Sequence, residues 1–91
     1  MAQTTSLLTE YRNRLDAAVT MFSLFIREIC PEAQLEISFV HYEDEDAHIW
    51  ITLPFTLSAE VREELANRIA EKSVDLLLSE GFLILAGIEE P

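Results

Sequence analysis

The spacing of apolar residues changes several times along this chain of 91 residues, and the order of these changes limits the folds that the chain can adopt. Between residues 6 and 30 the apolar side chains recur every three or four positions, which is the spacing of one face of an α-helix. The segments 35–42 and 47–53 alternate with period two, as strands do. Helical spacing returns over 58–79, and the uninterrupted apolar run 82–86 is typical of a strand covered on both faces. The sequence therefore predicts the order α-β-β-α-β.

Both predicted helices carry end signals. The hydroxyl-bearing residues at 4–6 are N-cap candidates for the first helix, and Pro31 disfavours its continuation. Ser58 is a good N-cap for the second helix, and Gly81 can close that helix in the left-handed conformation.

The aliphatic residues of the predicted hairpin suggest its register. Pairing Phe39 with Ile51, and Ile37 with Leu53, gathers the large aliphatic side chains on one face and leaves a short loop. A shift by one residue would mix these side chains with Glu36. The second face of the sheet then carries Val40, Tyr42, His48 and Trp50.

The simplest packing of these elements is a two-layer α+β fold, with two helices on one face of a small three-stranded sheet. No linker, repeat or low-complexity segment divides the chain, so residues 1–91 are expected to form one domain with short frayed ends at about 1–4 and 89–91. In this arrangement the second sheet face, with Trp50, Tyr42 and Val40, lies in water. An apolar patch of that kind usually marks an interface.

Charge restricts the partners. Six Lys and Arg against 17 Asp and Glu give a net charge of −11, which repels nucleic acid and anionic lipid surfaces. The surplus of carboxylates serves solubility, docking to a basic protein or mimicry of DNA. The single Cys30 excludes an internal disulfide, and the chain shows no targeting segment and no apolar run near the roughly 20 residues that span a bilayer. We therefore expect a cytoplasmic protein.

The residues that could carry chemistry do not form a recognisable site. The acidic run 43–46 lacks the ligand spacing and glycine of a calcium loop, so a solvated hairpin tip is the better interpretation. The predicted register sends His41 and His48 to opposite faces, which argues against a shared metal site. Cys30 ends an apolar helical face and is expected in the core. We assign no catalytic, cofactor-binding or metal-binding residue, and an enzyme is less favoured than a binding protein.

One stretch resembles a known family. The run Asp46-Ala47-His48-Ile49, the helix predicted at 58–79 and the run Glu80-Gly81-Phe82-Leu83-Ile84 follow the order seen in minimal nucleotidyltransferase domains. Active members of that family need a Gly-Ser pair and an Asp-x-Asp arrangement to hold metal and nucleotide. Here His41-Tyr42 and His48 stand in the corresponding places. The resemblance therefore implies at most an inactive relative.

The sequence favours a non-enzymatic module for protein–protein interaction or oligomerisation, most simply a homodimer or a subunit that binds a protein partner. The alternative is a small-molecule binder with a pocket beside Trp50, His48 and Tyr42. Trp50 with Tyr42 either stiffens the hairpin through cross-strand packing or anchors an interface, where Trp and Tyr are enriched. The predicted interface residues are Trp50, Tyr42, Val40 and His48 if the sheet is used, or Leu7, Leu8 and Leu24 if the helices are used.

Overall fold

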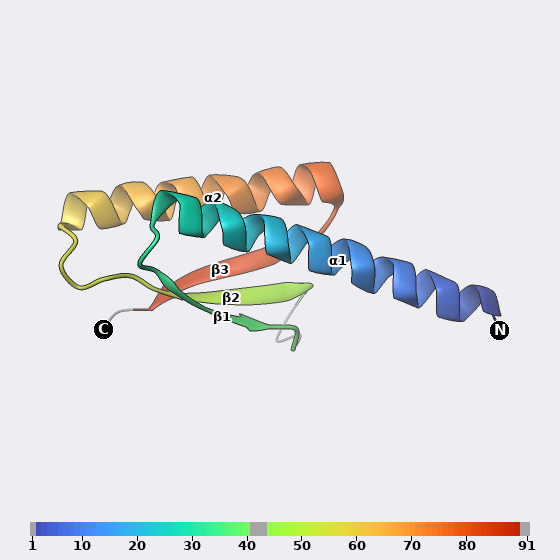
Figure 1. The fold of residues 1–91 in the computed structure, drawn as a ribbon. Helices are drawn as coiled ribbons and strands as arrows, with labels where there is room; N and C mark the ends of the chain where they lie inside the picture. The colour runs from blue at the N-terminus through green and yellow to red at the C-terminus, as the bar shows by residue number, and fades with distance from the viewer. Residues whose placement is uncertain (1, 41–43, 90–91) are drawn as a thin grey trace.

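The chain folds into two helices and a three-stranded sheet in a computed structural model that describes residues 2–40 and 44–89. In chain order the elements are α1 (Ala2–Ile29), β1 (Gln34–Ser38), β2 (Ala47–Thr52), α2 (Ala59–Glu80) and β3 (Ile84–Glu89). Both helices cover the same face of the sheet (Figure 1). The predicted α+β fold and the order α-β-β-α-β are confirmed.

The ends of α2 have the predicted caps. The Ser58 hydroxyl accepts a hydrogen bond from the Val61 N–H at 3.2 Å, and Gly81 closes the helix with a φ of 78°. The first helix is longer than predicted, because α1 begins at Ala2 rather than at residue 6. It ends at Ile29, just before Pro31, as the sequence indicated.

The sheet has the order β1-β2-β3, with β1 antiparallel and β3 parallel to the central strand. Ile37 pairs with Ile49, so the predicted pairings of Ile37 with Leu53 and of Phe39 with Ile51 are wrong. The two registers differ by an even number of residues, which leaves every side chain on the same face, and the hydrophobic pattern cannot distinguish them. The predicted short loop is replaced by the longer connection 39–46.

The last strand starts two residues later than predicted, at Ile84, and pairs with β2 from Ala47 onward. The preceding Phe82 belongs to the turn after α2, where its buried ring meets the Tyr11 ring edge-on at a centroid distance of 5.6 Å. The α2–β3 turn is thereby held against the first helix.

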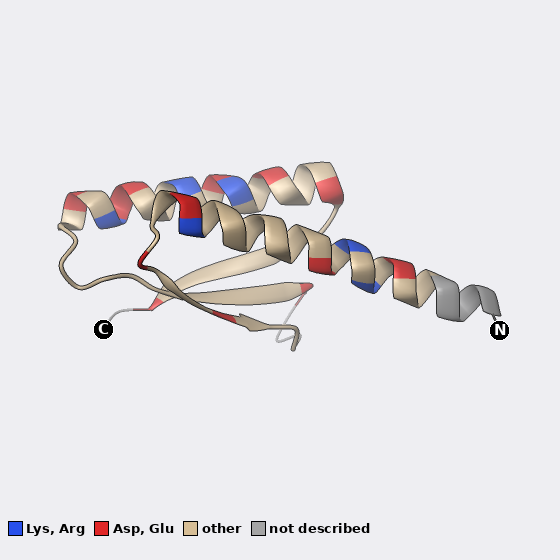
Figure 2. Cartoon of the chain, in the orientation of Figure 1, with Lys and Arg blue, Asp and Glu red and all other residues tan. Residues whose placement is uncertain are grey.

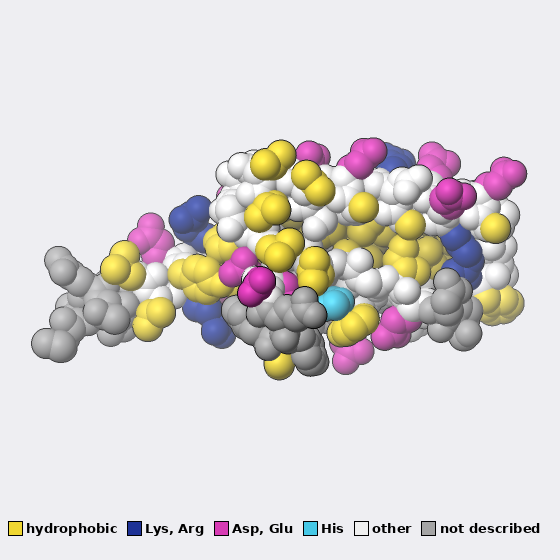
Figure 3. All heavy atoms as spheres, turned by 180° about the vertical axis from the view of Figure 1, so that it is seen from behind, with side chains coloured by type: hydrophobic (Ala, Val, Ile, Leu, Met, Phe, Trp, Pro, Cys, Tyr) yellow, Lys and Arg dark blue, Asp and Glu magenta, His cyan; other side chains and the backbone are white. Residues whose placement is uncertain are grey.

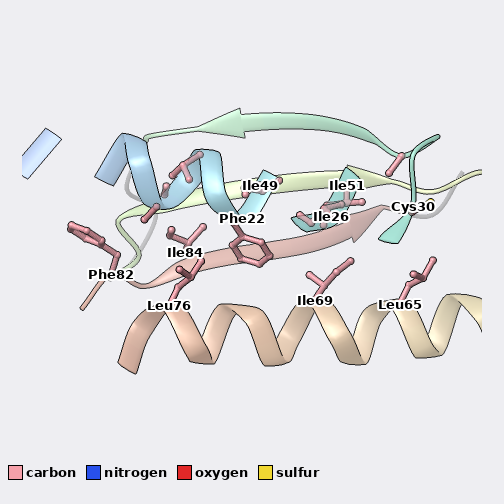
Figure 4. Close-up of a cluster of buried hydrophobic side chains, with 14 of the residues drawn as sticks. Phe22, Ile26, Cys30, Ile49, Ile51, Leu65, Ile69, Leu76, Phe82 and Ile84 are labelled. Carbon is pink, nitrogen blue, oxygen red and sulfur yellow. The ribbon is translucent and has the colours of Figure 1, made fainter. Parts of the chain in front are cut away.

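The hydrophobic core lies between the helices and the sheet. Phe22 and Ile26 of α1 and Ile49 and Ile51 of β2 are all fully buried (Figure 4). The second helix adds Leu65, Ile69 and Leu76. These contacts use one face of the sheet only, and neither helix of the described residues packs over the other face.

The first helix is much longer than the sheet beneath it. The helix has 28 residues and each strand has five or six, so the helix is longer even though a strand rises about twice as far per residue. The N-terminal turns of the helix project beyond the sheet (Figure 1). Leu7 and Leu8 lie on the projecting part and are 66% and 62% exposed. Neither α1 nor α2, the helices of the described residues, combines the length and apolar character needed to cross a membrane.

Candidate protein-interaction face

The open face of the sheet is organised by the alternation of β2. Ala47, Ile49 and Ile51 point toward the helices and are buried, so His48 and Trp50 point the other way and are half-buried. From the register, Glu36 of β1 lies beside Trp50 on one side and Gly87 of β3 on the other. We call this side of the sheet the open face.

Gly87 makes room for the aromatic residues of the open face. A Cβ atom at this position would lie 3.3 Å from His48 Nε2 and 3.3 Å from Trp50 Cε3 and Cζ3. The two rings stack on each other with a centroid distance of 3.9 Å and an interplanar angle of 18°. The absence of a side chain at Gly87 therefore lets the stacked pair pack against the backbone of β3.

A shallow depression of about 330 Å³ lies beside Trp50. Its lining residues come from all three strands and are Gln34, Leu35, Glu36, Trp50, Thr52 and Glu89. Glu36 of β1 pairs with Trp50, and Glu89 of β3 pairs with Thr52, so each outer strand contributes one acidic residue to the lining. The depression combines an aromatic surface with acidic and neutral polar groups.

The charges are divided between the two layers of the fold. All six Lys and Arg residues lie in α1 or α2, where acidic residues are also present (Figure 2). Outside the helices, the charged residues of the described chain are all acidic: Glu32, Glu36, Asp44, Glu45, Asp46 and Glu89. The open face is therefore one-signed, whereas the helical side carries both signs.

The structure gathers only part of the predicted sheet interface. Trp50 and His48 share the open face as predicted, but Val40 lies beyond the end of β1, which stops at Ser38. Val40 is 60% exposed, and its N–H donates to the Ser38 hydroxyl at 3.2 Å. The predicted placement of Val40 next to Trp50 depended on the wrong register. Tyr42 and His41 lie outside the described residues.

The predicted helical interface residues belong to a different surface. Leu7, Leu8 and Leu24 are exposed on α1, which covers the opposite face of the sheet from Trp50. Exposed apolar side chains also occur on α2, where Val74, Leu77 and Leu78 follow one another within two turns. Figure 3 shows hydrophobic side chains on the surface of α2, which lies along the top of that view. The molecule thus has two separate candidate surfaces.

The acidic run after β1 is not simply the solvated tip that the sequence suggested. Asp44 is exposed, but Glu45 is only 2% exposed. The Asp46 carboxylate accepts the Tyr11 hydroxyl at 2.6 Å and the Leu83 N–H at 2.9 Å, while the Asp46 N–H donates to the Leu83 carbonyl at 2.7 Å. Asp46 therefore joins α1 to the turn before β3, which corrects the prediction for this end of the run.

The contact with Asp46 changes the pKa of the Tyr11 hydroxyl. The hydrogen bond to Asp46, together with burial and the negative charge of Asp46, raises the pKa of Tyr11 above its ordinary value of 10.0. The stability from this contact is complete below pH 10 and is lost as the pH rises through the higher pKa of the folded state.

A Tyr11→Phe variant tests this contact. We expect the free energy of unfolding to fall by about 1 kcal/mol at neutral pH, because a partly exposed hydrogen bond to a carboxylate is removed. The difference from the unmodified protein should shrink above pH 10, where tyrosine ionises. Urea unfolding at neutral and alkaline pH measures both effects. Equal stabilities of the two proteins at neutral pH would show that Tyr11 acts through its ring alone, because phenylalanine keeps the ring that packs against Phe82.

The remaining chemical candidates stay apart. Cys30 is a free, buried thiol at the end of α1 and belongs to the core cluster. Within the described parts of the chain, no three His, Cys, Asp or Glu side chains are grouped in a way that could hold a metal ion.

Sequence reasoning missed three residues of the open face. Gly87, Glu36 and Glu89 were not singled out, although a glycine inside an apolar strand often marks a close approach of another group. The pairing of Glu36 with Trp50 and of Glu89 with Thr52 follows only from the register and from the parallel pairing of β3. Comparisons with models of protein families, with curated proteins and with solved structures give no match.

Proposed function

We propose that this chain is a non-enzymatic protein–protein interaction module and that its open face is the docking surface. The observation that carries the proposal is the stacked Trp50–His48 pair, held against Gly87 on the sheet face that neither α1 nor α2 covers. A rigid aromatic group loses little conformational entropy on binding, and tryptophan is the residue type most enriched among interface hot spots. Because Cys30 is a free thiol, we place the module in the reducing cytoplasm.

The full-length chain, immobilised and exposed to an extract of its native host, tests the proposal. We expect proteins that are retained by the unmodified chain to be lost with Trp50→Ala. The matched control is Met21→Ala, which truncates a side chain that is 46% exposed in the helical layer. Mass spectrometry identifies the retained proteins, and far-ultraviolet circular dichroism shows that each variant is folded. The same set of proteins on all three chains would overturn the proposal.

A thermal-shift series separates this function from the small-molecule alternative. A ligand that binds only the folded state raises the melting temperature by mass action. We expect nucleotides and divalent metal ions to leave the melting temperature unchanged. A dose-dependent rise that disappears in Trp50→Ala would instead support a small-molecule site beside the indole.

Self-association through the helices is the second candidate function. Exposed apolar residues on α1 and α2 favour it, namely Leu7, Leu8, Leu24, Val74, Leu77 and Leu78. The mixed charges of the helical layer allow two copies to meet without the repulsion expected between two one-signed open faces. A symmetric homodimer is the commonest way to cover such a surface, and it would leave the open face available to another protein.

A further inference from the structure

We propose that the depression beside Trp50 receives an arginine or lysine side chain from a basic segment of a partner protein. The proposal rests on the proposed function and adds the chemistry of the partner. The depression is lined by Trp50 together with one acidic residue from each outer strand, Glu36 and Glu89. A cation over the face of an indole is attracted by the ring, and the nearby carboxylates strengthen that attraction.

The geometry leaves one side of the indole for this contact. Trp50 and His48 lie two residues apart on β2 and point to the same face of the sheet. Their rings are stacked, so His48 covers one face of the indole. The depression lies among Gln34, Thr52 and Glu89, toward the end of β2 away from His48. Gln34 and Thr52 add neutral side-chain oxygens that can accept hydrogen bonds from an ammonium or guanidinium group.

Charge complementarity identifies the occupant. No Lys or Arg lies on β1, β2 or β3, so no cation from the strands themselves competes for Glu36 and Glu89. A second copy of the open face would bring further carboxylates toward these two and is disfavoured. A basic segment reverses the sign of the interaction, and the net charge of −11 steers it toward this protein.

Trp50 is the one tryptophan of the chain, so its fluorescence reports on the proposed site directly. The probe is a short unstructured peptide of alternating arginine and serine, added to the full-length protein at low salt. The control peptide carries citrulline in place of arginine, which keeps a similar shape and removes the charge. We expect a saturable fluorescence change with the arginine peptide, weakened by added salt, and no saturable change with the citrulline peptide.

Charge-removing variants locate the contact. We expect Glu36→Gln and Glu89→Gln each to weaken peptide affinity by about threefold, in line with a partly exposed ion pair. Glu63→Gln on the exposed surface of α2 removes the same charge and should change affinity by less than about 1.5-fold. Far-ultraviolet circular dichroism confirms the fold of each variant.

Two outcomes would overturn the proposal: no saturable response to the arginine peptide, or an equal loss of affinity in Glu63→Gln and in the sheet variants. The second would show that net charge alone attracts the peptide. Either result leaves the interaction module intact if the host extract still contains proteins whose capture requires Trp50. Loss of both the peptide response and the Trp50-dependent capture would remove the proposed function as well.

Discussion

Replacing Asp46 with alanine is expected to lower the free energy of unfolding by about 3 kcal/mol. The substitution removes the acceptor of two hydrogen bonds, one from the Tyr11 hydroxyl and one from the Leu83 N–H. Hydrogen bonds to a charged group contribute about 1.5–3 kcal/mol each, and partial exposure lowers that value here. The Leu83 N–H also loses its partner in a part-buried position, which adds a desolvation cost.

Asp44→Ala is the matched control, because it removes the same charge two residues away from an exposed position. We expect its effect to stay within about 0.5 kcal/mol, as is usual for surface substitutions. Urea unfolding monitored by the fluorescence of Trp50 gives both values. Equal stabilities for the two variants would contradict the assigned role of Asp46 and support a generic charge effect of the acidic run.

Light scattering at tens of micromolar protein is expected to give twice the 10.4 kDa mass of the monomer. The physical reason is the exposed apolar surface of the helical layer, which is buried when it packs against the same surface of a second copy. The double variant Leu24→Ser and Leu78→Ser should sediment at the monomer mass, since these leucines are 62% and 80% exposed on the two helices. Serine is preferred to glutamate because another carboxylate would increase general repulsion.

The corresponding control lies on the open face. Trp50→Ala should remain a dimer, because the helical layer and the open face are on opposite sides of the molecule. A monomer mass for the unmodified protein would exclude the dimer. A monomeric Trp50→Ala variant would instead place the contact between copies on the sheet.

Much of the fold could be predicted because the relevant signals are local. Ser58 and Gly81 cap α2 as their side-chain and backbone preferences require, and the period of the apolar residues identifies each element. The hairpin register could not be predicted from such signals, because the predicted and observed registers differ by an even number of residues. Both registers therefore place the same side chains on the buried face. The early start of α1 at Ala2 also lies outside the predicted caps.

The candidate site was predictable in its centre and not at its edges. Alternation along β2 fixes Trp50 and His48 on one face regardless of register. The positions of Glu36 and Glu89 depend on which residues of β1 and β3 pair with β2, and the role of Asp46 depends on α1 and on the turn before β3. Such contacts join segments that are distant in the sequence, so no local pattern reveals them.

The parallel pairing of β3 has a consequence for the order of folding. β1 and β2 can meet through a direct connection, whereas β3 reaches β2 only after α2 has crossed back over the sheet, and the contact of Asp46 with Leu83 spans 37 residues. Closing the longer segment costs more chain entropy, so β3 is expected to dock after the transition state for folding. Stopped-flow kinetics of Asp46→Ala should therefore show faster unfolding with a nearly unchanged folding rate. A slower folding rate would place the docking of β3 before that barrier.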